Sequence, residues 1–231
     1  TVRVNRLKTN VSELAALFDE EGVKAGVGKI PDTSLLLEST PGPLSELRSY
    51  RDGLFYIQGE STMLIPLCLA PKPGSLVYDF CCGVGGKTTH LAELMGDRGK
   101  ITAFDLYRHK LELLELNCRR LGISIVESRQ GDLFDQVPEL AEADAVLLDA
   151  PCSGLGVLRS RADLRWRKKE EDIALMSELQ SRMLEQVART VRPGGKLLYS
   201  TCSLEPEENE ELVERFVAKH RDFEFVNLDE A

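Results

Sequence analysis

Short apolar runs alternate with helical segments along most of this chain, and this alternation constrains the fold more than any other feature. Strands are predicted at 76–80, 100–105, 124–130, 145–149, 196–201 and 223–228, and helices at 88–95, 108–121, 170–191 and 206–220. Repeated strand–helix–strand units build a parallel sheet with helices on both faces. The sequence therefore predicts an α/β protein with a doubly wound, mostly parallel, Rossmann-like sheet.

Residues 1–60 have a different pattern and predict a small N-terminal α/β lobe. Within them, 2–4 and 53–58 are predicted strands, and 11–21 has the apolar spacing of a helix. Prolines and glycines punctuate the rest of the lobe. Residues 61–231 then make up the main domain of this prediction.

Composition restricts the setting in which the chain works. The net charge is −9, and no apolar run approaches the roughly 20 residues needed to cross a bilayer. The six cysteines lack the spacing of a small disulfide scaffold, and no histidine pairs with them at metal-ligand spacing. We therefore expect reduced thiols, no bound metal, no membrane contact, a cytoplasmic location and a monomer.

A glycine-rich loop follows the first predicted parallel strand and opens a helix. It reads Cys81-Cys82-Gly83-Val84-Gly85-Gly86-Lys87 and is called the glycine loop below. Such a loop lets a ligand approach the backbone closely, and the helix amino end attracts negative charge. A phosphate-binding P-loop needs glycine where Cys81 stands, and a dinucleotide fingerprint needs glycine where Thr88 stands. The remaining possibility is a pocket for a nucleoside joined to methionine.

Carboxylates at the ends of three consecutive strands favour that pocket. Asp105 ends the second strand, about twenty residues past the loop, where a carboxylate can accept both ribose hydroxyls. Asp132 ends the third strand, where it can accept from an adenine amino group, and Asp149 ends the fourth. Each acid alone could be a helix cap or a turn residue. Three acids around one glycine loop predict S-adenosylmethionine as the cofactor.

Two cysteines follow predicted buried strands directly. Cys152 lies in Asp149-Ala150-Pro151-Cys152-Ser153-Gly154, and Cys202 lies in Tyr199-Ser200-Thr201-Cys202-Ser203. Ligands of an open α/β sheet bind outside the carboxyl ends of its strands, so both thiols are predicted to face the cleft of the glycine loop. A thiol in a cleft is a candidate nucleophile, and two thiols suggest separate steps of attack and release.

A basic run follows Cys152 and predicts contact with phosphates. Its members are Arg159, Arg161, Arg165, Arg167, Lys168 and Lys169. The negative net charge argues mildly against a polyanionic partner, but the position of this run favours an RNA-contacting edge of the cleft. A solvated loop is the alternative. Trp166, the only tryptophan, could stack on a base or pack in the cleft wall.

These elements together resemble the Sun/NSUN (bacterial RsmB-like) family of RNA cytosine-5 methyltransferases, over nearly the whole chain. Besides the two cysteine elements, the resemblance rests on Arg3-Val4-Asn5-Arg6-Leu7-Lys8, Gln58-Gly59-Glu60-Ser61 and Pro206-Glu207-Glu208-Asn209-Glu210. It implies a methyltransferase sheet, S-adenosylmethionine as the cofactor, and RNA as the partner, ribosomal rather than transfer RNA. Transfer RNA as the substrate, or a non-catalytic RNA-binding factor for ribosome assembly, are the alternatives.

The resemblance also implies roles for single residues. Cys202 would be the nucleophile, Cys152 the thiol that assists product release, and Asp149 an acid that stabilises charge on the base. Cofactor contacts are implied for Cys81, Cys82, Gly83, Val84, Gly85, Gly86, Lys87, Asp105, Asp132 and Asp149. DNA cytosine methyltransferases use a Pro-Cys thiol as their nucleophile, so the second thiol at Cys202 points to the RNA enzymes.

The chain departs from the family pattern in three places, one of which is Gly59 in place of the usual Asp. The usual Cys-Ala-Ala-Pro-Gly-Gly-Lys-Thr loop has Cys82, Gly83 and Val84 in place of its Ala, Ala and Pro. The final antiparallel strand that completes the family's sheet is expected to be missing after 223–228.

Overall fold

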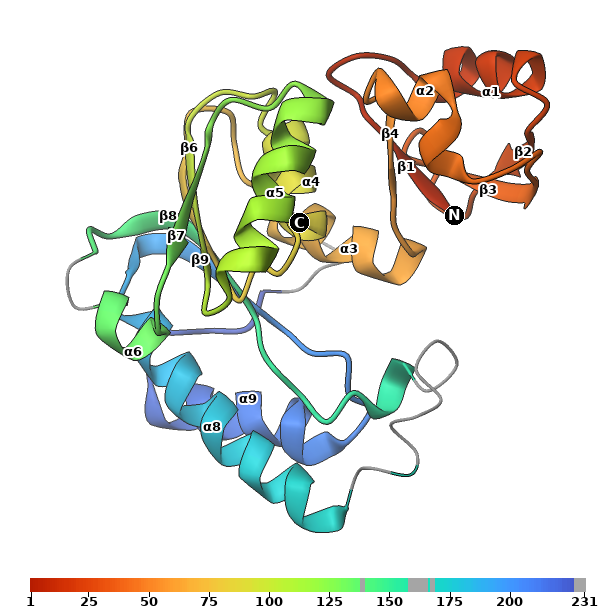
Figure 1. Ribbon diagram of the computed structural model, residues 1–231. Helices are drawn as coiled ribbons and strands as arrows, with labels where there is room; N and C mark the ends of the chain where they lie inside the picture. The colour runs from red at the N-terminus through yellow and green to blue at the C-terminus, as the bar shows by residue number, and fades with distance from the viewer. Residues whose placement is uncertain (138–139, 158–165, 167–168, 227–231) are drawn as a thin grey trace.

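The computed structural model describes residues 1–137, 140–157, 166 and 169–226 (Figure 1). Within these ranges the backbone forms two sheets. One is antiparallel, with strand order β2-β3-β1-β4, and the other is parallel, with order β7-β6-β5-β8-β9. The predicted α/β class with a doubly wound parallel sheet is confirmed.

The antiparallel sheet carries the N-terminal part of the chain. Its elements are β1 (Val2–Val4), α1 (Val11–Glu20), β2 (Lys24–Val27), β3 (Ser34–Ser39), the 3₁₀ turn η1 (Leu44–Glu46), α2 (Arg48–Arg51) and β4 (Phe55–Ile57). Successive side chains of a strand point to opposite faces. In β1, Val2 and Val4 are therefore buried with Phe18 in the core of this sheet, while Arg3 points to the other face.

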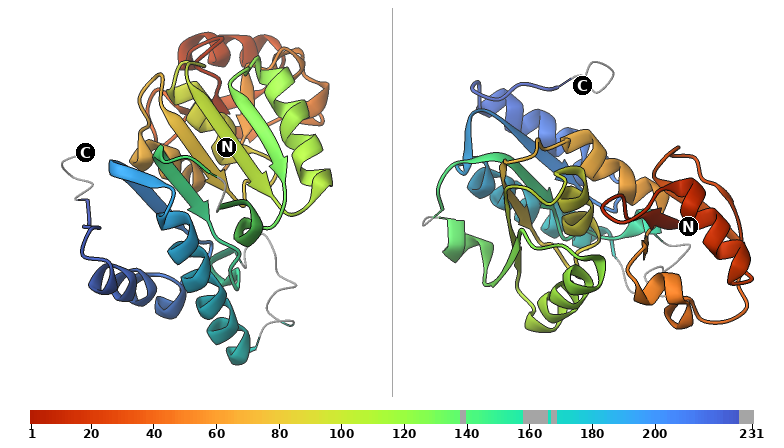
Figure 2. Two further views of the ribbon diagram at one scale, coloured as in Figure 1. Left: turned by 90° about the vertical axis from the view of Figure 1, so that its left-hand side faces the viewer. Right: turned by 90° about the horizontal axis from the view of Figure 1, so that it is seen from above.

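The parallel sheet lies between two layers of helices (Figure 2). Its strands are β5 (Leu76–Phe80), β6 (Lys100–Asp105), β7 (Val126–Gln130), β8 (Ala143–Asp149) and β9 (Val191–Ser200). One face is covered by α3 (Glu60–Leu69), α4 (Gly86–Leu94) and α5 (Arg108–Leu121). The other is covered by α6 (Leu133–Gln136), α8 (Glu170–Ala188) and α9 (Glu210–Lys219). No helix in the described ranges is long and apolar enough to cross a membrane.

The strand order brings the predicted site residues to one edge of the parallel sheet. β5 lies between β6 and β8, and its connections leave in opposite directions, which makes the crevice beside it a topological switch point. Phe80 pairs with Phe104 and with Leu148, so these three strands end at the same level. The loops that follow β5, β6, β8 and β9 therefore meet at one edge.

The long helix ends earlier than its sequence predicts, and the strand after it begins earlier. α8 ends at Ala188 rather than at 191, and Thr190 Oγ1 donates to the carbonyl of Val187, 2.7 Å away. Val191, predicted to end the helix, and residues 192–195, predicted to turn between helix and strand, belong to β9 instead. Gly194 has φ +74°, and the register with β8 shifts there, so the proline–glycine segment is a bulge in an edge strand.

The predicted strand at 223–228 is wrong for its described part. Residues 223–226 form no strand, and 227–228 lie outside the described residues. Phe223 packs instead on Phe216, with ring centres 5.3 Å apart, and so the chain stays against the end of α9. The helix predicted at 206–220 is divided into a 3₁₀ turn, η4 (Pro206–Glu208), and α9.

Candidate active site

The glycine loop has left-handed backbone angles at three positions, two of which are glycines. Cys81, Gly83 and Gly85 have φ of 62°, 58° and 87°. A Cβ at Gly85 would lie 2.2 Å from Leu114 Cδ1, so a larger residue would displace the Leu114 side chain as well as strain the backbone. The amide of Gly83 donates to Asp105 Oδ2 at 2.9 Å. The end of β6 therefore holds the loop in place.

A cavity of about 390 Å³ lies beside the loop and brings the three predicted carboxylates together. Its wall combines these acids with aromatic and aliphatic side chains, as in sites for flat organic ligands. The lining residues are Phe80, Cys81, Phe104, Asp105, Leu106, Tyr107, Lys110, Gly131, Asp132, Leu133, Phe134, Asp149, Pro151, Leu179 and Met183.

Two of these acids also have structural partners. Asp105 Oδ1 accepts from the amide of Tyr107 at 2.9 Å, and Lys110 Nζ lies 3.4 Å from the same carboxylate. Asp132 Oδ1 accepts from the amide of Phe134 at 2.9 Å and caps α6. The helix-cap alternative thus describes Asp132 correctly, and the residue lines the cavity as well.

Asp79 lies under the glycine loop, and the sequence assigned it no role. It is fully buried in β5, and Thr88 Oγ1 donates to its Oδ2 at 2.5 Å. Its Oδ1 has no hydrogen-bond partner among the described residues. Burial raises the pKa of Asp79 to about 7. A fraction of this carboxyl is therefore neutral at physiological pH.

Asp149 is held from two sides where the cavity meets the cysteine loops. Lys87 Nζ donates to Asp149 Oδ2 at 2.6 Å, and Ser200 Oγ donates to Oδ1 at 2.8 Å. The two charged side chains are only 17% and 31% exposed, so water screens this ion pair less than one on the open surface. Asp149 and Lys87 therefore have a fixed geometry beside the thiols.

The two cysteines predicted to share a cleft are in contact. Cys152 Sγ and Cys202 Sγ lie 2.7 Å apart, and the amide of Cys202 donates to Cys152 Sγ at 3.2 Å. Cys202 is exposed and Cys152 is half-buried. A ligand that enters the cleft would therefore meet Cys202 more readily.

Among the thiols near the glycine loop, Cys202 has the pKa of a nucleophile. Burial raises the pKa of Cys81 to about 12 and also raises that of Cys82. The hydrogen bond between the two close thiols lowers the pKa of Cys202 to about 7 and raises that of Cys152. Cys202 is therefore the thiolate near neutral pH, while Cys152 keeps its proton and donates it.

We expect the alkylation of Cys202 by iodoacetamide to accelerate with rising pH around a midpoint of about 7, because only the thiolate reacts. Mass spectrometry of the peptide that contains Cys202, over a series of pH values, measures this midpoint. In Cys152→Ala the donor is lost, and the midpoint should rise toward that of a free thiol, about 8.5. An unchanged midpoint in Cys152→Ala would show that Cys152 does not lower the pKa of Cys202.

Glu208 ties the two cysteine loops together, and no pattern in the sequence predicts this. The residue is fully buried, and it accepts from the Ser153 amide at 2.9 Å, Ser203 Oγ at 2.7 Å and Gln180 Nε2 at 2.7 Å. Ser153 and Ser203 each follow one of the cysteines. The carboxylate of Glu208 thus fixes how the two thiols face each other.

The predicted RNA-contacting residues lie mostly outside the described part of the chain. Those outside it are Arg159, Arg161, Arg165, Arg167 and Lys168. Trp166 is described and is 87% exposed, so it does not pack in a cleft wall here. Contact of this segment with RNA stays a prediction.

Comparison with known proteins gives consistent matches. The family model for 16S rRNA methyltransferase RsmB/F matches residues 66–231. A probable ribosomal RNA small subunit methyltransferase B from Bacillus subtilis is 36% identical over 97% of this chain and 50% of its own length. The human 28S rRNA (cytosine(4447)-C(5))-methyltransferase is 36% identical over 98% of this chain and 28% of its own.

A solved structure of similar fold supports the same family. NSun6 from Pyrococcus horikoshii, determined with SFG, has a TM-score of 0.84 and 26% identity over 94% of this chain and 79% of that one. The chain spans about half the length of the bacterial relative named above.

Proposed function

This chain belongs to the 16S rRNA methyltransferase RsmB/F family, and from that membership we propose that it methylates carbon 5 of a cytosine in ribosomal RNA, with S-adenosylmethionine as methyl donor. The observation that carries the proposal is the contact between Cys202 and Cys152 beside the acid-lined cavity. Carbon 5 of cytosine is a poor nucleophile. A thiol that adds to the base, and a second that assists release, supply what this reaction needs.

The cavity suits the cofactor in size and in chemistry. Its volume of about 390 Å³ lies within the range of ligand pockets, roughly 300–1,000 Å³. Apolar side chains such as Phe104 and Leu133 suit an adenine ring, and Asp105 and Asp132 offer carboxylate oxygens to hydroxyl and amino groups. When bound, S-adenosylmethionine would supply a methyl group on a positively charged sulfur, an electrophile for carbon 5.

The attack falls to Cys202 in this proposal. Its thiolate adds to carbon 6 of the cytosine, and electron density moves onto carbon 5. The lowered pKa of Cys202 makes this thiolate available near neutral pH. In this proposal Asp149, which Lys87 and Ser200 hold, shares a proton with ring nitrogen 3 and stabilises the developing charge.

Release falls to Cys152. Once carbon 5 carries the methyl group, its proton must leave before the bond between carbon 6 and Cys202 can break. Once Cys202 is bonded to carbon 6, it no longer holds the Cys152 proton by the hydrogen bond between the two thiols. Cys152 loses that proton to water and, as a thiolate, takes the carbon 5 proton, or a water that Cys152 orients takes it. The electron pair then restores the double bond between carbons 5 and 6, and Cys202 departs as a thiolate. The target base must be unpaired or extruded, because carbon 6 is not accessible inside a duplex.

The test is to trap the adduct by removing the release step. Cys152→Ala is incubated with S-adenosylmethionine and unmodified ribosomal RNA, and in parallel with transfer RNA, and run on a denaturing gel. We expect a protein–RNA band with ribosomal RNA that disappears when Cys202→Ala is added. A band that forms with transfer RNA but not with ribosomal RNA would identify transfer RNA as the substrate instead. No band, despite measured binding of cofactor and RNA, would contradict the chemistry for this chain.

A further inference from the structure

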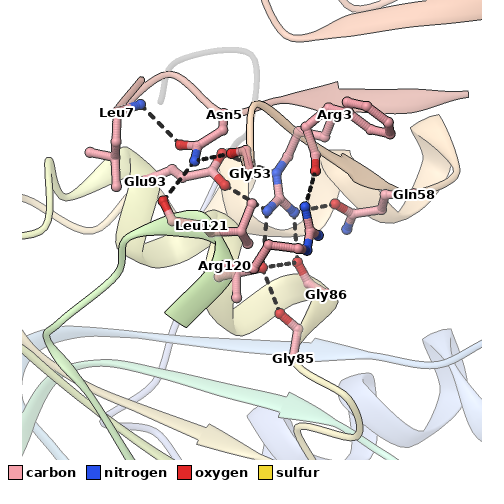
Figure 3. Close-up of polar contacts among 12 residues, drawn as sticks. Arg3, Asn5, Leu7, Gly53, Gln58, Gly85, Gly86, Glu93, Arg120 and Leu121 are labelled. Carbon is pink, nitrogen blue, oxygen red and sulfur yellow. Dashed lines mark hydrogen bonds and ion pairs between the residues drawn. The ribbon is translucent and has the colours of Figure 1, made fainter. Parts of the chain in front are cut away.

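Arg3 reaches from the N-terminal sheet into the methyltransferase domain (Figure 3). Because it points away from the core that Val2 and Val4 share, its side chain enters the space against α4. It is fully buried there. Arg3 Nε lies 3.1 Å from Glu93 Oε2, and Nη2 lies 2.8 Å from Oε1, so the guanidinium holds the Glu93 carboxylate with two parallel hydrogen bonds.

The remaining donors of Arg3 hold the backbone where the glycine loop becomes α4. Nη1 donates to the carbonyl of Gly86 at 2.7 Å and to the side chain of Gln58. Nη2 also donates to Thr89 Oγ1 at 2.9 Å, and that hydroxyl donates to the carbonyl of Gly85 at 2.7 Å. One side chain of the N-terminal sheet thus fixes two consecutive glycines of the loop.

We infer that Arg3 is a positioning residue for cofactor binding, an inference that rests on the proposed function. Glycines have many accessible conformations, so a loop that depends on Gly85 at φ +87° loses entropy when a ligand orders it. Hydrogen bonds that hold Gly85 and Gly86 in advance lower that cost. A buried ion pair such as Arg3–Glu93 adds little net stability, because desolvation offsets its attraction. The contribution of Arg3 that matters here is therefore to hold the glycine loop in one conformation.

A second set of contacts docks the same lobe without reaching the loop. Arg120, at the end of α5, donates to the carbonyls of Tyr50 and Phe55 at 2.9 and 3.0 Å and stacks on the Tyr50 ring. Asn5 Nδ2 donates to the carbonyl of Leu121 at 2.8 Å. Because both sets join the same two parts of the chain, Arg120 offers a matched control for Arg3.

The experiment compares Arg3→Lys with Arg120→Lys by titration calorimetry with S-adenosylmethionine, without RNA. Lysine keeps the charge but cannot serve Glu93, Thr89 and Gly86 at once. We expect Arg3→Lys to bind the cofactor about tenfold more weakly, a typical coupling between sites, and Arg120→Lys to bind as wild type does. In methyl transfer, KM for the cofactor should rise in Arg3→Lys while kcat at saturation stays unchanged.

A double variant separates loop positioning from folding. Arg3→Met with Glu93→Met removes both buried charges together and should keep the thermal midpoint of unfolding near that of wild type. It should still bind the cofactor weakly, because Gly86 has lost its donor. Wild-type affinity in both Arg3 variants, or equal weakening in Arg120→Lys, would overturn the inference. If the wild-type chain bound no cofactor, the proposed function would fail first. Weakened binding in Arg3→Lys without any RNA adduct would sustain this inference and overturn only the reaction.

Discussion

Cys202→Ala is expected to lower the rate of cytosine methylation by a factor on the order of 10⁴ or more, because no other group supplies the addition to carbon 6. Cys152 is close enough to replace it, but its pKa is raised by the same hydrogen bond that lowers the pKa of Cys202. Transfer of a labelled methyl group to RNA in a single turnover measures the loss. Cofactor affinity should not change, because Cys202 does not line the cavity.

Cys68→Ala is the matched control, since Cys68 lies on α3 and outside the cavity lining. It should retain wild-type activity. If Cys202→Ala methylated RNA at a rate within tenfold of wild type, Cys202 would not be the nucleophile. If Cys152→Ala were inactive and formed no adduct at the same time, the Pro-Cys arrangement of the DNA enzymes would describe this site instead.

Asp149→Asn is expected to lower kcat by about 10² to 10³, the range measured when one group that stabilises transition-state charge is removed. Asparagine keeps the shape of the side chain, but it cannot carry the charge that faces Lys87 Nζ at 2.6 Å. It also cannot share a proton with ring nitrogen 3 as a carboxyl can. Steady-state kinetics at saturating cofactor and RNA measure the change.

Ser200→Ala is the control for this variant, because it removes only the hydrogen bond to Asp149 Oδ1. We expect a loss of about tenfold, the lower end of the range for one hydrogen bond to a charged group, because Lys87 still holds the carboxylate. If kcat fell no further in Asp149→Asn than in Ser200→Ala, the charge of Asp149 would have no part in the reaction.

The sequence predicted the parallel sheet well for a physical reason. Strands buried on both faces read as continuous apolar runs, so β5 and β6 were predicted with the bounds that the structure has. Because such strands end at one edge, their terminal residues Asp105, Asp149 and the cysteines could be placed around one cleft before any contact was known.

The contacts that support the site could not be predicted in the same way. Val2-Arg3-Val4 reads as a strand with one face in water, and only the packing of α4 against that face buries the arginine. Glu208 lies in an acidic run typical of a solvated surface, yet it is the member that is fully buried. Both depend on which elements meet in three dimensions, and local patterns in the sequence do not contain that information.

The buried arginine also has a consequence for how the chain is made. Arg3 is separated from Glu93 by 90 positions, and β1 is an inner strand of its sheet. During synthesis on the ribosome, the charge of Arg3 emerges long before the carboxylate that pairs with it. An unpaired charge is costly to bury, and contacts distant in sequence form slowly. We therefore expect the lobe that contains Arg3, although it is translated before α4, to finish folding only once α4 is in place.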